Sequence, residues 1–309
     1  MTSGSSAGRP PGQPPELPVR PGHLHRLGLV TDRPGAEAGA WLARTLGAVP
    51  MTGGMVSARG FPVPAAGALA ESATDSALFW LGTSPLAVFS PTDPGSPVVG
   101  FLRRYGPGVH SLAWTVDDLW TVEALLRRAD VRITGVDVPG RHLFMHPRDT
   151  GGVLIEWTDL ELAGEPRAGA PAPLASGAPS VPVLGLAWTT ALVPDVRATA
   201  DLLGHLVAVT PLPGPGGRRN DPDGPLDLAV GDTVLRLATG PGTGRLASFC
   251  LAVADLAATE RRLSTVGIRV LHRTGAVLAT DPADTLGLTI EWTDRHTLPA
   301  HTARDGPGF

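Results

Sequence analysis

PRDTGGVLIEWTD at residues 147–159 and PADTLGLTIEWTD at residues 282–294 are two copies of one motif. Both copies contain Pro, then Asp-Thr, then Gly, and both end in Ile-Glu-Trp-Thr-Asp. Agreement at this density within one chain indicates an internal duplication, and repeats of this kind correspond to repeated structural units. The apolar run inside each copy is short enough to be a strand, so the motif predicts the same strand in two related domains.

A second repeated pattern lies upstream of each motif and predicts the start of a unit. Its four occurrences are HRLGLVT (25–31), HSLAWTVDDL (110–119), GLAWTT (185–190) and SFCLAVADL (248–256). Each reads as a short strand that leads into an amphipathic helix; in residues 119–130, Leu119, Val122 and Leu126 recur at helical spacing. Short apolar runs follow each helix. The predicted unit is therefore strand–helix–strand–strand–strand, and it occurs four times.

These units predict an α+β fold of two tandem domains, each a cup-shaped mixed β-sheet built from paired βαβββ units with flanking helices. The first domain is expected at 23–160 and the second, diverged one at 183–294. Segments rich in Pro, Gly, Ala and Ser bury too little apolar surface to become ordered. They predict a disordered tail at 1–22, a linker at 161–182 and a second tail at 295–309.

The composition of the chain excludes several classes of function. The chain has 309 residues, a net charge of −4 and a single cysteine, Cys250. This balance gives no basic surface for nucleic acid, and one cysteine cannot form an internal disulfide or a cysteine metal cluster. Because no apolar run approaches the roughly 20 residues that span a bilayer, and the first 22 residues have no apolar signal segment, we expect a cytoplasmic protein without a membrane partner.

The doubled βαβββ unit resembles the vicinal oxygen chelate superfamily, which includes glyoxalase, bleomycin-resistance proteins, extradiol dioxygenases and methylmalonyl-CoA epimerase. The resemblance is closest to the epimerase branch across 79–159, where SPVVGFLRRYGPGVHSLAWTVDDL and FMHPRDTGGVLIEWTD carry it. It extends over 23–160 and, more weakly, over 183–294. The resemblance implies a small-molecule site in a cup. It does not fix the chemistry, because one fold hosts many functions.

In this superfamily, histidines on the first strand of each unit and Glu or Gln on the last strand commonly bind a divalent cation. Glu156 and its copy Glu291 stand at the last-strand positions. In VHSLAWTV the alternation of large and small residues places Ser111 and Ala113 in the cup and Trp114 outside it. Four cup positions hold histidine in relatives. In this chain the same alternation places these residues there: Arg26, Ser111, Gly185 and Ser248. The remaining ligand position falls on Ala87, and on Arg236 in the second domain.

Each cup therefore keeps a glutamate and gains an arginine: Arg26 with Glu156, and Arg236 with Glu291. A guanidinium is a permanent cation that can bind a carboxylate through two hydrogen bonds. Our hypothesis is that the arginine replaces the positive charge of a metal and that no cofactor is required. The pair is then either structural or a site for an anionic or carbonyl-bearing ligand.

The alternative is a metal site made of His25, His110 and Glu156. Both histidines lie one residue before the expected cup positions, so a one-residue bulge in each first strand is needed to turn them inward. Two histidines and one carboxylate with open positions would suit Zn, Fe or Mn. If no such bulge exists, both histidines are strand-end residues bonded to backbone or solvent.

These candidates favour a metal-independent isomerase, epimerase or lyase in which Glu156 moves a proton and Arg26 stabilises the oxyanion. We expect Ser111, Ala87 and His110 to line the ligand site of the first domain, and Arg236 and Glu291 that of the second. Two other functions remain open: a metal-dependent epimerase, lyase or dioxygenase, and a binding protein that sequesters a drug-like molecule. Because one chain already supplies four units, a monomer is feasible, and a homodimer is the alternative.

Overall fold

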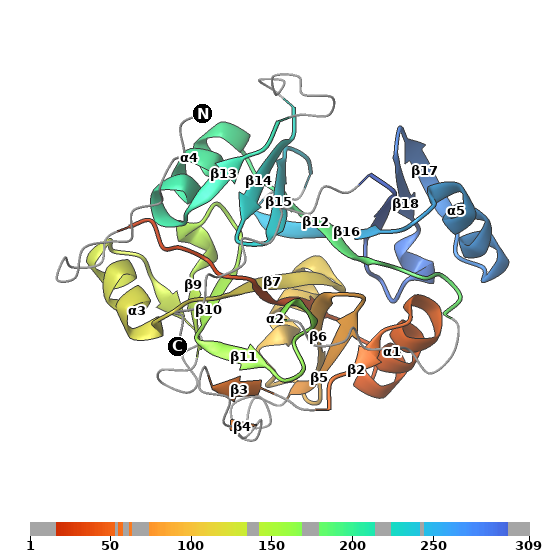
Figure 1. The fold of residues 1–309 in the computed structure, drawn as a ribbon, viewed down its shortest axis with the longest axis horizontal. Coiled ribbons are helices and arrows are strands. Elements are labelled where there is room, and N and C mark those ends of the chain that lie inside the picture. Colours follow the sequence, from red (N-terminus) through yellow and green to blue (C-terminus); the bar gives the residue numbers. More distant parts are fainter. Residues whose placement is uncertain are drawn as a thin grey trace.

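The computed structural model describes residues 17–52, 55–57, 62–63, 74–134, 142–168, 179–213, 224–241 and 244–295. Two mixed sheets of eight strands each form the body of the molecule (Figure 1). The first sheet has the order β2 (Val49–Pro50), β5 (Thr74–Leu81), β6 (Ser84–Pro91), β1 (Leu24–Val30), β7 (Gly108–Thr115), β10 (Ile155–Thr158), β9 (His142–Met145) and β8 (Ile133–Thr134).

The second sheet repeats this topology strand for strand. Its order is β13 (Val209–Pro211), β14 (Leu226–Val230), β15 (Thr233–Ala238), β12 (Gly185–Leu192), β16 (Arg245–Ala252), β19 (Ile290–Thr293), β18 (Val277–Thr280) and β17 (Val270–Thr274). A small third sheet joins β11 (Leu160–Leu162), β3 (Met55–Ser57) and β4 (Pro62–Val63). In each large sheet the first strands of two βαβββ units lie antiparallel at the centre. The α+β prediction of paired βαβββ units is therefore confirmed.

Helices follow each first strand, as the periodicity predicts. They are α1 (Gly35–Trp41) with a π-helical turn (Leu42–Leu46), α3 (Leu119–Arg128), α4 (Val196–Leu206) and α5 (Leu256–Thr265). Three of the four begin at an aspartate whose carboxylate accepts from a backbone N–H of the first turn, namely Asp118, Asp195 and Asp255. Short 3₁₀ turns lie at Pro147–Asp149, Pro166–Ala168 and Pro282–Asp284.

One further helix distinguishes the two domains. Helix α2 (Val98–Tyr105) joins β6 to β7 in the first domain. In the second domain, residues 239–244 make the corresponding connection from β15 to β16. That segment is shorter than α2 itself, and its described residues, 239–241 and 244, contain no helix.

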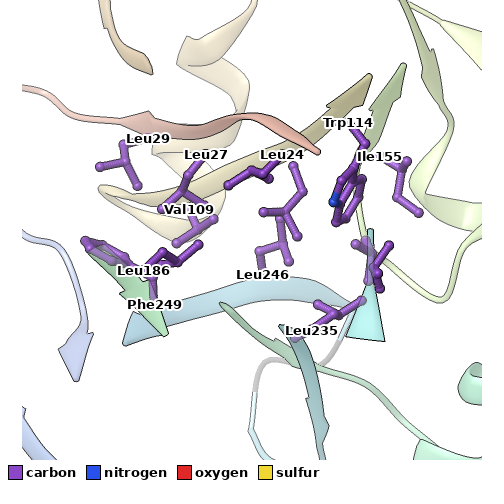
Figure 2. Packing of buried hydrophobic residues seen from close by; sticks show 14 of the residues in the cluster. Leu24, Leu27, Leu29, Val109, Trp114, Ile155, Leu186, Leu235, Leu246 and Phe249 are labelled. Carbon is purple, nitrogen blue, oxygen red and sulfur yellow. The ribbon is translucent and has the colours of Figure 1, made fainter. Parts of the chain in front are cut away.

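The central strands of the two sheets pack back to back. Figure 2 shows Leu27, Val109 and Trp114 of the first domain facing Leu246 and Phe249 of the second. Buried side chains from both domains belong to one apolar cluster. The outward leucines of the central strands thus pack against the other sheet. The two domains therefore share a core.

The chain before the first domain also takes part in the fold. Val19 is buried, its N–H donates to the carbonyl of Leu206 at 2.9 Å, and its carbonyl accepts from Ala208 at 2.8 Å. We expected residues 1–22 to be a disordered tail; the described part, from residue 17 on, instead lies against the second domain. The expected linker likewise begins with a strand, β11, in which Leu162 is buried. No helix in the described residues is long and apolar enough to cross a membrane.

A buried ion cluster fastens the linker to both domains. The guanidinium of Arg167 binds Glu165 at 2.7 Å and Asp232 of the second domain at 2.8 Å, and it donates to the carbonyl of Leu24 at 2.7 Å. The other carboxylate oxygen of Asp232 accepts from the Leu24 N–H at 2.6 Å. The side chains of Arg167 and Glu165 are each only 8% exposed. Removal of the arginine would leave two carboxylates buried without their counter-ion.

Arg167→Ala is therefore expected to lower the free energy of unfolding by about 3–5 kcal/mol, the usual cost of breaking a buried pair by removing one partner. Urea unfolding followed by circular dichroism measures it. Arg273→Ala is the control, because Arg273 pairs with Glu260 on the surface, and such a pair contributes about 0–1 kcal/mol. Equal losses in the two variants would show that the cluster does not hold the domains together.

Candidate functional site

Bulges in the two central strands determine which side chains enter the first cup. On β1, Leu24 pairs with Trp114 and Arg26 with Ala113, so His25 is an extra residue. On β7, the pairing moves from Ser111 to Val109, so His110 is the extra residue there. A bulge interrupts the alternation of faces. The two bulges that the metal alternative requires are therefore both present.

Arg26 and Glu156 meet at the centre of the cup. Both residues pair with Ala113, one from each neighbouring strand, and the small alanine leaves space between them. The Nη2 of Arg26 donates to Oε1 of Glu156. Their side chains are 8% and 1% exposed, so this is an ion pair shielded from solvent. The sequence prediction that these two residues lie together agrees with this geometry.

His25 binds the other side of the same guanidinium. Nη1 of Arg26 lies 2.7 Å from Nδ1 of His25. Burial lowers the pKa of His25 well below its usual value, and the charge of Arg26 lowers it further. A neutral imidazole carries one proton, and a guanidinium can only donate, so Nδ1 is the acceptor and Nε2 carries the proton. Nε2 of His25 is buried and has no hydrogen-bond partner among the described residues.

His110 lies in an aromatic environment away from this pair. Its ring centroid is 5.2 Å from that of Phe101 on α2 and 6.4 Å from that of Phe89 on β6, both with edge-to-face geometry. Burial lowers its pKa to about 4, so the ring is neutral at neutral pH. Its Nδ1 is buried and, within the described chain, has no partner.

The donor chemistry of the cup does not fit a divalent cation at His25, His110 and Glu156. One nitrogen of His25 is bound to Arg26 and the other carries a proton, so neither offers a lone pair. The carboxylate of Glu156 is bound to a fixed positive charge. In the described chain, no group of three or more His, Cys, Asp and Glu side chains is arranged to hold a metal ion.

The two other expected cup residues have different environments. Ala87 is fully buried among Val30, Phe89 and Val98, where α2 covers the sheet, so it does not face an open cup. Ser111 is buried beside Gly28, and a Cβ at Gly28 would come within 2.5 Å of its hydroxyl. This glycine is therefore required for the close approach of the two central strands.

The second cup differs from the expected Arg236–Glu291 pair. Arg236 instead hydrogen-bonds Asp227 at 2.7 and 2.9 Å, and its guanidinium lies 3.9 Å from the ring centroid of Trp188. Glu291 accepts from Ser248 at 3.0 Å and from Nε1 of Trp188 at 3.2 Å. The one cation described here, Arg236, and the two carboxylates, Asp227 and Glu291, are thus already bound within this cup.

The sequence analysis missed Trp188 and Asp227. A bulge at Ala187 places Trp188 opposite Cys250, in the place that Arg26 has opposite Ala113 in the first domain. Gly185 was therefore the wrong choice for that position. Asp227 could have been found, because LDLAV and TVLRLAT flank a Gly-Asp turn, and a hairpin there brings Asp227 opposite Arg236.

Solved structures share this architecture over nearly the whole chain. The 2,3-dioxygenase LapB from Pseudomonas sp. KL28 superposes with a TM-score of 0.57 at 16% identity, covering 91% of this chain and 93% of its own. A mutant of 4-hydroxymandelate synthase from Streptomyces coelicolor also gives a TM-score of 0.57 at 16% identity, covering 91% of this chain and 95% of its own. At this identity the likeness establishes the fold alone.

Curated relatives are similar to part of the chain. The ethylmalonyl-CoA/methylmalonyl-CoA epimerase of Cereibacter sphaeroides is 32% identical over 83 residues, which are 25% of this chain and 62% of that protein. The mitochondrial methylmalonyl-CoA epimerase of Bos taurus is 31% identical over 103 residues, 31% of this chain and 57% of that protein. The matched stretches thus span less than two thirds of either relative. No protein-family model matches the chain. In its tandem βαβββ sheets and in these matched stretches, the chain is similar to the vicinal oxygen chelate superfamily, near the methylmalonyl-CoA epimerase branch.

Proposed function

We propose that the first-domain cup binds a small carbonyl-bearing or anionic organic molecule without a divalent cation, and that Arg26 supplies the positive charge. The observation that carries this proposal is the buried contact of Arg26 with both Glu156 and His25. A metal bound to Glu156 would have to approach a fixed guanidinium charge, which is electrostatically unfavourable in a site that excludes water. The positive charge of Arg26 therefore takes the place of the charge of a metal ion.

The same residues offer donors to a ligand oxygen. The Nε2–H of His25 is a buried donor without a partner in the described chain, and such a donor gains free energy when an acceptor reaches it. The guanidinium of Arg26 has further N–H groups besides those that bind Glu156 and His25. A carbonyl or carboxylate oxygen that reached both donors would be held, and negative charge that develops on it would be stabilised.

Glu156 is the group that would move a proton. When Arg26 shifts from the carboxylate to the ligand, Glu156 becomes available as a base for a C–H beside the polarised carbonyl. The proton goes to the carboxylate, the electron pair goes to the oxygen as an enolate, and return of the proton to carbon completes an isomerisation. A lyase would instead expel a leaving group from the enolate. The similarity to epimerases supports the first course.

Two other functions each have one observation in their favour. The bulges at His25 and His110 favour a metal-dependent enzyme with Glu156, provided the contact between Arg26 and His25 breaks on metal binding. Arg26 and Glu156 already neutralise each other, and the Glu156 side chain is only 1% exposed. This favours a protein that binds its ligand without transforming it.

We place this function in the cytoplasm, in a monomer or a homodimer. The two sheets that one chain already packs back to back support the monomer, because no second copy is needed to cover either of them. The ligand is a small molecule.

The enzyme proposal predicts α-proton exchange in the absence of metal. Protein treated with EDTA and incubated with methylmalonyl-CoA in D₂O should exchange the α-proton, as followed by NMR. Glu156→Gln should slow the exchange about 100-fold or more, the usual contribution of a positioned base. Glu123→Gln, on the surface of α3, is the control and should leave the rate unchanged. Binding without exchange would replace catalysis by sequestration, and exchange that EDTA abolishes would favour the metal-dependent reading.

The two neutral histidines predict a loss of stability in acid. Their pKa values in the folded protein lie below the unfolded value of about 6.5. The unfolded chain therefore binds more protons below that pH, and stability falls as pH decreases from about 6.5 toward 4. The slope approaches about 1.4 kcal/mol per pH unit for each histidine. Urea unfolding at pH 7.5, 6 and 5 measures it.

His110→Phe should remove the share of that slope that comes from His110. His272→Gln, an exposed position on β17, should leave it as it is. If stability falls with pH at the same slope in the wild type, His110→Phe and His272→Gln, then the fold does not hold His110 neutral.

A further inference from the structure

A pocket of about 290 Å³ lies between the two domains, outside the Arg26–Glu156 pair. It is bounded by α2, by the first residues of β7 and by the first residues of β16, so both domains contribute to its walls. Phe101, Val109 and Leu246 provide apolar surface. Neither Arg26 nor Glu156 lines it, so the pocket is a separate place from the cup discussed above.

Two arginines stand at this pocket around one aromatic ring. The guanidinium of Arg104 lies 5.1 Å from the ring centroid of Tyr105, and that of Arg245 lies 5.7 Å from the same centroid. All three side chains line the pocket, and the described lining contains no aspartate or glutamate. Two like charges held near one ring create a positive potential that favours an anion at this pocket.

His110 adds a neutral polar group beside the apolar residues of the wall. It lines the pocket, and its Nδ1 is buried and has no hydrogen-bond partner in the part of the chain that the structure describes. An unpartnered buried nitrogen costs free energy, which a ligand that hydrogen-bonds the ring would recover. The burial that keeps the pKa of His110 near 4 also keeps the ring neutral, so it can donate or accept.

We propose that this interdomain pocket binds a small carboxylate with an apolar or aromatic body, whose anionic group is held by Arg104 and Arg245 and whose body packs on Phe101 beside His110. Arginine binds carboxylates through paired N–H groups, and both guanidinium groups lie near the ring of Tyr105. Because β16 supplies Arg245 and α2 supplies Arg104, bound ligand would join the two domains. This goes beyond the function proposed for the first-domain cup and does not depend on it.

The size of the pocket limits the ligand. At roughly 30 Å³ per molecule, its volume corresponds to about ten waters. A ligand with a similar number of non-hydrogen atoms would fill it, which suits a monocyclic aromatic acid. Phenylacetate is of the appropriate size and charge, and phenylacetamide is its neutral counterpart of the same shape.

The test is calorimetric titration of the full chain with both probes. Phenylacetate should bind, and phenylacetamide should bind at least tenfold more weakly. Arg245→Gln and Arg104→Gln should each weaken phenylacetate binding at least tenfold. Arg103→Gln is the matched control, because Arg103 is the neighbouring arginine on α2 and does not line the pocket.

Gly100→Leu provides a second test that does not alter charge. Gly100 lines the pocket from α2, and no atom lies within 4 Å of a Cβ built there, so a larger residue enters the pocket and a helical leucine is well tolerated. This variant should fold and lose phenylacetate binding. The proposal is overturned if phenylacetate does not bind, or if it binds equally well to Gly100→Leu, Arg104→Gln and Arg245→Gln. α-Proton exchange in the cup is measured separately, so either proposal can fail alone.

Discussion

The buried ion pair between Arg26 and Glu156 is the interaction on which the first cup depends. A glutamate that is almost completely shielded from water needs a cation, because an unpaired buried carboxylate is very costly. In this chain the guanidinium of Arg26 meets that need. Burial, together with the charge of the same guanidinium, keeps His25 in a neutral form whose remaining N–H is unpaired in the described structure.

The shared core supports the strands that hold this pair. The strands that carry it also carry the leucines and Trp114 that pack against the second sheet (Figure 2). The indole N–H of Trp114 donates to Thr233 of the second domain at 3.1 Å, and Arg167 connects β1 to Asp232. The second domain therefore supports the first one from behind, while Arg236 of its own cup is bound to Asp227 and lies over the ring of Trp188.

Much of the fold could be predicted from sequence because repetition is a global signal. Two copies of the IEWTD motif and four first strands fix the number, kind and order of the units. The pairing of Arg26 with Glu156 could also be predicted, since Ala113 lies between them whichever bulge is present. The positions of Trp188 and Val19 depended on local geometry. Alternation of large and small residues cannot show a bulge, so Trp188 was missed. It also cannot show that Val19 hydrogen-bonds to the backbone of the second domain.

The most direct test of the account is elemental analysis of the purified protein by mass spectrometry after equilibration with Zn, Mn and Fe salts and removal of loosely bound ions. If Arg26 supplies the charge of the cup, each metal should remain far below one ion per chain, and His110→Ala should make no difference. One tightly bound ion per chain in the wild type, lost in His110→Ala, would contradict the account.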